Sequence, residues 1–149
     1  MPSKITPSDQ ALRLDNQLCF ALYSASLAMT KLYKPLLDEL GLTYPQYLAL
    51  LVLWEQDGVS VSELGQRLNL DSGTLTPLLK RLEVAGFLSR LRDTEDERRV
   101  RVLLTAEGRA LKAQAKRIPG CILRATHGDL AEVAVLTKQV QALRDQLLG

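Results

Sequence analysis

The chain has little of several residue types on which enzymes and membrane proteins rely. It contains one histidine, two cysteines and only 5% aromatic residues. A single histidine offers no Ser/His/Asp arrangement, and Cys19 and Cys121 are too far apart in the sequence for a zinc motif. The longest apolar run, Tyr47 to Trp54, is far shorter than the roughly 20 residues of a membrane-spanning helix. We therefore expect a soluble, cytoplasmic protein that is not an enzyme, has no cofactor or metal, and has no membrane partner.

The composition suits one small globular domain. The 149 residues are 46% hydrophobic, which supports a core, and the abundance of leucine over aromatic residues favours helices. A formal net charge of +2 permits a nucleic-acid partner without requiring one. In a reducing cytoplasm the two cysteines would not form a permanent structural disulfide, so a bond between them would be transient.

Residues 59–86 have the pattern of two short helices joined by a tight turn. Ser60 and Glu63 form a capping box, in which hydroxyl and carboxylate accept hydrogen bonds from free backbone N–H groups, so a helix should begin there. Asp71 or Ser72 can cap the second helix, and Gly86 ends it. The inward face of the second helix is formed by Leu75, Leu78, Leu79 and Leu82.

The outward face of this second helix has the side chains of a DNA recognition helix. Short polar groups near its start can reach base edges, and cations further along can reach phosphates or guanine. These residues are Ser72, Gly73, Thr74, Thr76, Lys80 and Arg81. Pro77 lacks an N–H and fits best near a helix start, which favours a start one or two residues later than the capping residues indicate.

A β-hairpin is predicted next, with strands at 87–92 and 99–103 and a tip at 93–97. Five arginines lie between Arg90 and Arg101, interleaved with four acidic residues that keep the local net charge near neutral. The layout of these charges, rather than their sum, therefore indicates a nucleic-acid contact.

The segments on both sides of this region predict helices that pair in a dimer. A long helix should run from about Asp9 into the thirties, where Pro35 kinks or interrupts it. Its apolar residues have the spacing of a helix-packing seam: Leu18, Leu22, Ala25, Met29, Leu32 and Leu36. A last helix from Asp129 has a similar seam: Val133, Leu136, Val140, Leu143 and Leu147. A chain of this length has little left of its own to cover either seam.

Two more helices complete the predicted architecture. Thr43 opens another capping box and starts a helix at about 44–56. Thr105 caps a helix that Pro119-Gly120 breaks, directly before Cys121. The large apolar residues Phe20, Met29 and Trp54 are expected in the core, or else in an apolar pocket.

Residues 96–105, Asp-Glu-Arg-Arg-Val-Arg-Val-Leu-Leu-Thr, resemble the Asp-x-Arg wing signature of the MarR (multiple antibiotic resistance regulator) family of winged-helix repressors. The resemblance extends over nearly the whole chain, and residues 70–81 and the surroundings of Cys19 resemble the organic hydroperoxide resistance regulators. It implies a fold that is mainly α with a small β-hairpin wing, in a single domain spanning 1–149. The parts are a winged helix-turn-helix lobe at about 44–104 and dimerisation helices at about 9–40 and 106–149.

The resemblance also implies how the wing would meet DNA. Asp96 would orient Arg98, which enters the minor groove, where arginine is favoured by the strongly negative potential. A homodimer would place two recognition helices about one helical turn apart on an inverted-repeat operator in double-stranded DNA. The wing residues expected at the DNA are Arg90, Arg92, Asp96, Arg98 and Arg99.

Cys19 is either an inert packed residue or a redox sensor. A free helical cysteine is usually a small hydrophobe, but Tyr23 lies one turn away, and a phenolic O–H can stabilise the thiolate that attacks peroxides. Tyr33 lies 14 positions beyond Cys19, about 21 Å along a continuous helix, and could reach the thiol only from a partner helix. The resemblance implies this arrangement, with Tyr44 joining the hydrogen bond of Tyr33.

The resemblance further implies that Cys121 is the second thiol. An organic hydroperoxide would oxidise Cys19 to a sulfenic acid, which condenses with Cys121 of the partner subunit to an intersubunit disulfide, and the oxidised dimer would release its operator. The alternatives are that Cys121 is a packed cysteine beside a helix break, or that a small cellular thiol takes its place.

Three other functions remain open at this stage. The chain could be a MarR-type repressor released by a small aromatic or phenolic ligand, with incidental cysteines. It could be a thiol peroxidase that uses Cys19, although His127 is its only histidine and no catalytic constellation appears. It could also bind only proteins, which the outward cations argue against.

Overall fold

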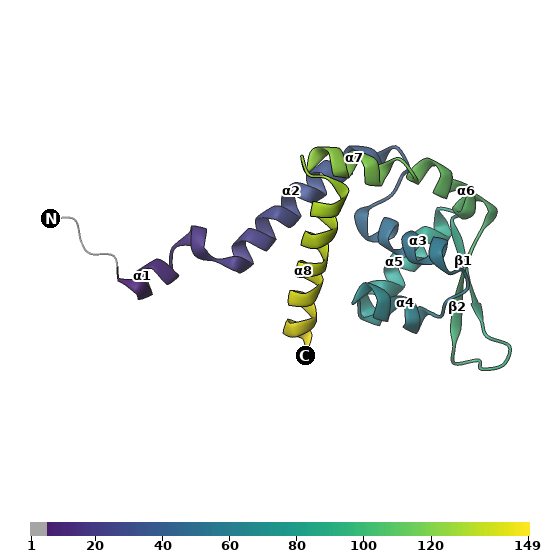
Figure 1. The fold of residues 1–149 in the computed structure, drawn as a ribbon. Coiled ribbons are helices and arrows are strands. Elements are labelled where there is room, and N and C mark those ends of the chain that lie inside the picture. The colour runs from purple at the N-terminus through teal and green to yellow at the C-terminus, as the bar shows by residue number, and fades with distance from the viewer. Residues whose placement is uncertain (1–5) are drawn as a thin grey trace.

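The computed structural model describes residues 6–149, and it is mainly helical with one two-stranded antiparallel sheet, as predicted (Figure 1). No helix among these residues is long and apolar enough to cross a membrane. The elements in chain order are α1 (Pro7–Ala11), the 3-10 helix η1 (Leu14–Asn16), α2 (Leu18–Asp38), α3 (Tyr44–Glu55), α4 (Val61–Leu68), α5 (Ser72–Val84), β1 (Leu88–Arg92), β2 (Val100–Leu104), α6 (Ala106–Ala115), α7 (Ile118–Ala125) and α8 (Leu130–Leu148).

A compact lobe forms where α3, α4 and α5 turn their leucines toward one another. Its fully buried side chains include Leu50, Leu53, Leu64, Leu75, Leu79 and Leu82. Each buried leucine contributes about 2 kcal/mol of hydrophobic free energy. The caps lie where the sequence predicts them. Ser60 Oγ accepts from the Glu63 N–H at 3.1 Å, Asp71 Oδ1 accepts from the Thr74 N–H at 2.8 Å, and Thr43 caps α3 in the same way.

α5, the predicted recognition helix, begins directly after Asp71, so the later start suggested by Pro77 is wrong. Pro77 is the sixth residue of α5, and its missing N–H leaves the Gly73 carbonyl without its usual helical donor. Gly73 is exposed, so water can satisfy that carbonyl. The leucines buried on the opposite face of α5 outweigh the loss of one hydrogen bond.

The second strand of the hairpin, β2, has hydrogen-bonded neighbours along both of its edges. In the hairpin, β1 pairs with β2 in an antiparallel register that runs from Leu88 opposite Leu104 to Arg92 opposite Val100. Along the other edge of β2, the Gly58 N–H donates to the carbonyl of Val102 at 3.1 Å, and the Val102 N–H donates to that of Val59 at 2.8 Å. The wing is thereby connected to the segment that leads into α4.

Gly108 lets α6 pack directly on the chain that precedes β1. A Cβ at this position would lie 2.0 Å from the backbone oxygen of Phe87. The indole N–H of Trp54 donates to the Gly108 carbonyl at 2.9 Å, and the hydroxyl of Thr105, which caps α6, donates to the Gly86 carbonyl at 2.6 Å. These contacts join α6 to α3 and to the base of the wing.

The predicted long N-terminal helix is divided into two. The amide side chains of Asn16 and Gln17 donate to the carbonyls of Gln10 at 2.8 Å and Ala11 at 2.6 Å. These bonds satisfy the last carbonyls of α1 and end it, so α2 begins only after Gln17 and not near Asp9.

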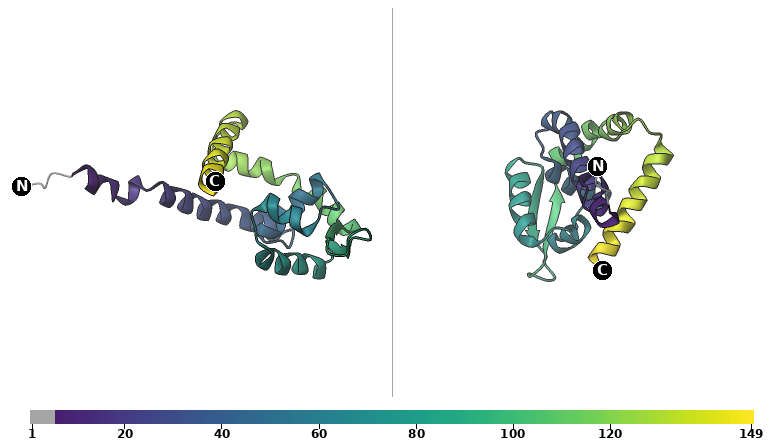
Figure 2. Two further views of the ribbon diagram at one scale, coloured as in Figure 1. Left: turned by 90° about the horizontal axis from the view of Figure 1, so that it is seen from below. Right: turned by 90° about the vertical axis from the view of Figure 1, so that its left-hand side faces the viewer.

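Proline does not interrupt α2, which continues through Pro35 to Asp38. The missing N–H leaves only the carbonyl of Lys31 without its helical donor, and Lys31 is exposed to water. The unbroken helix makes α2 a long rod that projects from the lobe (Figures 1 and 2).

The predicted break at Pro119-Gly120 is also displaced. α6 ends at Ala115, and Pro119 lies in the first turn of α7, where a residue has no helical acceptor for an N–H. Cys121 therefore lies inside α7 rather than after a helix break. α8 starts as expected, with Asp129 accepting from the Glu132 N–H at 2.8 Å.

Three tyrosine rings hold the end of α2 against α3. The ring centroids of Tyr33 and Tyr44 are 5.0 Å apart, and that of Tyr47 lies 6.0 Å from Tyr33 and 6.3 Å from Tyr44. Trp54 continues the cluster edge-on to Tyr47 and packs against the core, as expected. Burial, together with the neighbouring Tyr44 and Tyr47, raises the pKa of Tyr33 to about 12, and burial also raises the pKa of the other two tyrosines.

We predict that the free energy of unfolding decreases as pH rises from 10 toward 12. The unfolded chain releases the Tyr33 proton near the ordinary tyrosine pKa of 10.0, whereas the folded chain holds it to about 12. In this window the folded state binds more protons, so stability is lost as pH rises. Urea unfolding midpoints at several pH values test this, with Tyr33→Phe as the control that should show a shallower decline. An equally steep decline in the variant would exclude the tyrosine as its cause.

Gly108→Ala should destabilise the lobe by about 3 kcal/mol, because the new Cβ would overlap a backbone oxygen that cannot move freely. Gly120→Ala is the matched control, since a Cβ there meets nothing within 4 Å and helix propensity favours alanine by up to about 1 kcal/mol. Chemical denaturation of both variants checks the difference. Equal stability of the two variants would show that α6 does not depend on this close approach.

Candidate nucleic-acid interface and thiol site

The outward face of α5 is free, as the sequence predicts. The leucines of α5 are buried in the lobe, and the polar residues that face solvent are Ser72, Gly73, Thr74, Thr76, Lys80 and Arg81. Between this helix, α4 and the wing lies a concavity of about 610 Å³, whose lining includes Ser62, Thr76 and Arg98. α5 and the wing thus border one concave surface.

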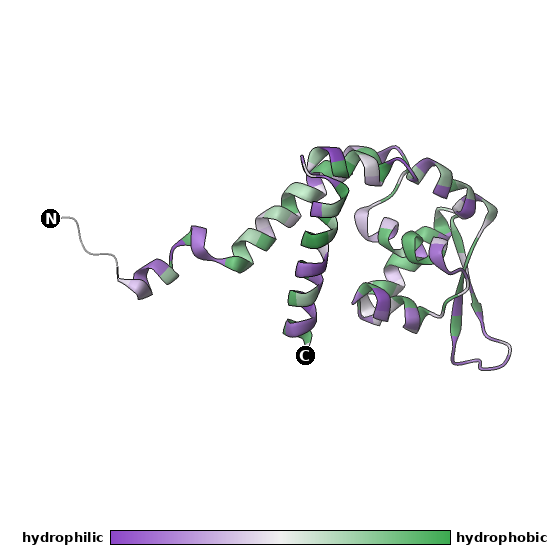
Figure 3. Cartoon of the chain, viewed as in Figure 1, coloured by the Kyte–Doolittle hydropathy of each residue, from purple (hydrophilic) through white to green (hydrophobic). Residues whose placement is uncertain are grey.

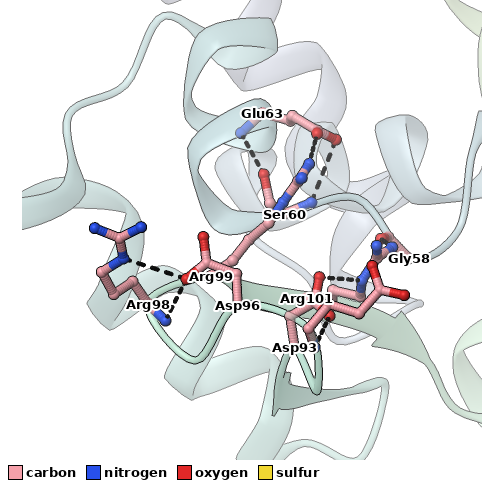
Figure 4. A network of polar contacts seen from close by, with 9 residues as sticks. Gly58, Ser60, Glu63, Asp93, Asp96, Arg98, Arg99 and Arg101 are labelled. Carbon is pink, nitrogen blue, oxygen red and sulfur yellow. Dashed lines mark hydrogen bonds and ion pairs between the residues drawn. The ribbon is translucent and has the colours of Figure 1, made fainter.

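At the wing tip, Asp96 and Arg98 make the contact that the resemblance implies (Figure 4). One carboxylate oxygen, Asp96 Oδ1, accepts from the backbone N–H of Arg98 at 3.1 Å and from its Nε at 3.2 Å. The Arg98 side chain nevertheless remains 92% exposed. Asp96 therefore orients Arg98 without covering it.

The other wing arginines do not all point outward. Arg90 pairs with Glu83 at 3.3 Å at the base of the wing, where its hydrogen bonds hold the pKa of Glu83 below the usual range. Arg99 pairs with Glu63 of α4. Arg92 is exposed and donates to the carbonyl of Glu97 at 3.0 Å.

Arg101 connects the hairpin to the segment before α4. Its Nε donates to Asp93 at 3.2 Å and its Nη1 to the Gly58 carbonyl at 3.1 Å. The Glu95 N–H and the Arg101 side chain lower the pKa of Asp93. Neither this bond to Gly58 nor the pairing of Arg99 with Glu63 was predicted from the sequence, because no local spacing relates residues about 40 positions apart.

Cys19 lies near the start of α2 and is exposed, as is Tyr23 one turn later. Tyr33 lies toward the far end of the same helix, and the ring of Tyr44, the first residue of α3, lies beside it. Because α2 is unbroken between Cys19 and Tyr33, about 21 Å of rigid helix separates them. The chain by itself therefore brings Cys19 close to Tyr23 and keeps it away from the other two tyrosines.

Cys121 is half-buried in α7, with a guanidinium nitrogen of Arg124 3.4 Å from its sulfur. One turn earlier, Arg117 pairs with Glu39, which directly follows α2. Cys19 and Glu39 are 20 residues apart, about 30 Å along the helix axis. A disulfide requires Cα atoms within about 7 Å, so the two cysteines of one chain cannot pair in this fold.

Both terminal helices contain many apolar residues (Figure 3), several of which are exposed to solvent. In α2 only Leu37 is buried, and α8 has no buried residue. The exposed apolar residues of these helices include Leu18, Phe20, Leu22, Leu27, Met29, Val135, Leu136, Val140 and Leu147. Phe20 and Met29 are therefore not in the core of the single chain, contrary to expectation.

Comparison with known proteins identifies relatives over most of the chain. Residues 31–115 match the family model described as transcriptional regulator SarA/Rot. A protein of Bacillus subtilis named organic hydroperoxide resistance transcriptional regulator is 58% identical over 112 residues, which cover 75% of this chain and 76% of that protein. The HTH-type transcriptional regulator TtmR of Methylorubrum extorquens is 50% identical over 142 residues, covering 95% and 73% of the two chains.

The solved structures to which this chain is similar are also of transcriptional regulators. Reduced AbfR bound to DNA is 35% identical, superposes with a TM-score of 0.79, and is matched over 94% of this chain and 99% of that one. AbfR with its disulfide formed is also 35% identical, matched over 91% and 96%, but superposes with a TM-score of 0.65. All these relatives are regulators rather than enzymes. The chain thus belongs to the MarR-type winged-helix transcriptional regulators, in the branch of the organic hydroperoxide resistance regulators.

Proposed function

We propose that this chain is a redox-sensing repressor that acts as a homodimer in the cytoplasm. The reduced dimer binds an inverted-repeat operator in double-stranded DNA, and it releases the operator when an organic hydroperoxide oxidises Cys19 and a disulfide forms with Cys121 of the partner subunit. The observation that carries this proposal is the separation of the exposed Cys19 from Tyr33 along one unbroken helix, with Tyr44 of α3 beside Tyr33.

The exposed apolar faces of α2 and α8 support the dimer. Such faces on two long helices are costly in water, and burial against a second copy recovers about 25 cal/mol per Å². If two α2 helices cross in antiparallel fashion, Cys19 lies opposite the partner's Tyr33 when the crossing is centred on Ser26, midway between them. Ala25 and Ala28 beside this point are small enough for the two backbones to approach closely.

In this arrangement one thiol has phenolic donors from both chains. Tyr23 comes from its own helix, and Tyr33 and Tyr44 come from the partner subunit. The phenol of Tyr33, whose pKa is raised to about 12, is protonated near neutral pH, as an ordinary tyrosine also is, and can donate to a thiolate. Hydrogen bonds to the charged form of a thiol stabilise that form, which is the nucleophile.

The oxidation takes place in two steps, formation of a sulfenic acid and then of a disulfide. The Cys19 thiolate attacks the terminal oxygen of the hydroperoxide and the O–O bond breaks. The sulfur is oxidised to a sulfenic acid, and the peroxide is reduced to an alkoxide that takes a proton to become an alcohol. The thiol of Cys121 of the partner subunit then attacks the Cys19 sulfur, an S–S bond forms, and the oxygen leaves as water.

The helix that carries Cys121 is well placed to transmit this change. α7 buries Ile118 and Ile122 and is joined to the end of α2 through Arg117 and Glu39, and the preceding α6 is attached to the base of the wing. A displacement of Cys121 would therefore be transmitted to the lobe through α7 and α6. The poorer superposition of this chain on the disulfide form of AbfR than on the reduced, DNA-bound form supports such a movement.

On the operator, α5 would occupy the major groove. Ser72, Gly73, Thr74 and Thr76 near its start would face base edges, and Lys80 and Arg81 would face phosphates. At the wing, Arg98 would enter the minor groove and the exposed Arg92 would approach the backbone, whereas Arg90 and Arg99 would act through their paired carboxylates Glu83 and Glu63.

One observation favours a second candidate, a repressor released by a small ligand. An open, mainly apolar groove of about 360 Å³ lies between α3 and α6, lined by Tyr47, Leu51 and Trp54, with Lys112, Lys116 and Glu55, which is paired with Arg67, beside them. Rings and lysines together suit a small aromatic carboxylate. In such a repressor the ligand would release the DNA even from a variant in which both cysteines are replaced.

Oxidation by cumene hydroperoxide in slight excess should weaken operator binding of the wild type by roughly ten-fold or more, within the usual range of coupling between two sites. Cys19→Ser should stay bound, because it lacks the thiolate that reacts. Gel shifts on an inverted repeat from the protein's own promoter measure release, and non-reducing gels should show a thiol-sensitive dimer band that Cys121→Ser lacks.

Two results would contradict this prediction in different ways. If Cys19→Ser releases DNA as the wild type does, the sensor is not Cys19. If hydroperoxide has no effect but an aromatic carboxylate such as salicylate releases both the wild type and Cys19→Ser, the ligand-responsive repressor is correct.

A further inference from the structure

Glu63 has two partners that belong to different parts of the lobe. At the third position of α4, its Oε2 accepts from the Ser60 N–H at 3.4 Å and completes the capping box. Its Oε1 faces the guanidinium of Arg99 at the start of the second half of the wing (Figure 4). One carboxylate thus joins the first helix of the helix-turn-helix to the wing.

The backbone of Arg99 closes the wing tip that carries Arg98. The Arg99 N–H donates to the carbonyl of Asp96 at 2.9 Å, and the Asp93 N–H donates to the carbonyl of Arg99 at 2.7 Å. Because one peptide bond links the two residues, the position of the Arg98 backbone depends on that of Arg99. A restraint on the Arg99 side chain restrains the direction in which Arg98 leaves the wing.

The charges on this surface make Glu63 unexpected in a DNA-binding face. It lines the same concavity as Thr76 and Arg98, and its side chain is 44% exposed. A carboxylate here repels phosphates, so a purely electrostatic view predicts that its removal strengthens DNA binding. The capping bond to Ser60 does not require a negative charge, because glutamine can also accept it. The charge of Glu63 is useful at this place only if its contact with Arg99 contributes more than that repulsion costs.

We propose that Glu63 and Arg99 are positioning residues that set the angle of the wing, so that Arg98 reaches the minor groove while α5 occupies the major groove. This inference rests on the proposed function, in which Arg98 contacts the operator. Arg99 is in this view not a DNA ligand, and the Glu63–Arg99 pair acts on binding through Arg98.

The test is a cycle of operator affinities for wild type, Glu63→Gln, Arg98→Ala and the double variant. Glutamine preserves the capping box, because its carbonyl oxygen can still accept from Ser60. Its amide N–H₂ then faces the Arg99 guanidinium, so two donors meet and the contact is lost. The thermal unfolding midpoint of Glu63→Gln should lie within about 4 °C of the wild type, since an exposed ion pair contributes little to stability.

Glu63→Gln should weaken binding of the reduced dimer roughly five-fold, as expected for loss of an exposed pair at the upper end of its range. In the Arg98→Ala background the same change should have no effect. Arg99→Gln should behave in the same way, with a salt dependence of affinity like that of the wild type, whereas Arg98→Ala should reduce the salt slope by about one.

Tighter binding by Glu63→Gln, or equal weakening with and without Arg98, would overturn the positioning role, as would a smaller salt slope for Arg99→Gln. In those cases a weakened Arg98→Ala still supports the proposed DNA contact. If Arg98→Ala binds as well as the wild type, the wing contact in the proposed function fails, and the positioning role fails with it.

Discussion

The rigidity of α2 is the constraint on which the proposed switch depends. An unbroken helix cannot fold back, so Cys19 at one end and Tyr33 at the other are kept about 21 Å apart in each chain. The tyrosine cluster holds the far end of the helix on the lobe, while the near end projects with its apolar residues exposed. A second copy is the natural cover for this surface, and it would bring phenols to the thiol. The same helix would then carry the sensing thiol and form part of the dimer interface.

The wing is held by contacts from three directions, which explains how a short hairpin can have a defined position. β1 pairs with one edge of β2, residues 58–60 pair with the other edge, and the Glu63–Arg99 contact ties the tip end to α4. At the base, the close approach of Gly108 to Phe87 brings α6 against the same hairpin. The lobe is therefore connected to the helices that carry the thiols through packed backbone rather than through a loose linker.

The charged residues of the wing serve different purposes although they look alike in the sequence. Arg98 is oriented by a neighbouring carboxylate and left exposed, whereas Arg90 and Arg99 pair with carboxylates of α5 and α4. Arg101 pairs with a carboxylate of the hairpin itself and donates to the Gly58 carbonyl. The interleaved acids explain the near-neutral local charge. They select which arginine faces outward, and a stripe of unpaired cations would not make that selection.

The sequence by itself determined what depends on neighbouring residues. Capping boxes, the leucine spacing of α5 and the alternation in β2 are local, so the starts of the capped helices α3, α4, α5, α6 and α8, the buried face of α5 and the wing were predictable. The contact between Asp96 and Arg98 was implied by the family resemblance. Tertiary structure decided the rest. Asn16 and Gln17 ended α1 by reaching back to its carbonyls, and burial elsewhere in the helices compensated for prolines that local rules treat as breaks. The partners of Arg99 and the distance between Cys19 and the tyrosine cluster are set only when segments far apart in the chain pack together. The local spacing of residues does not predict such contacts.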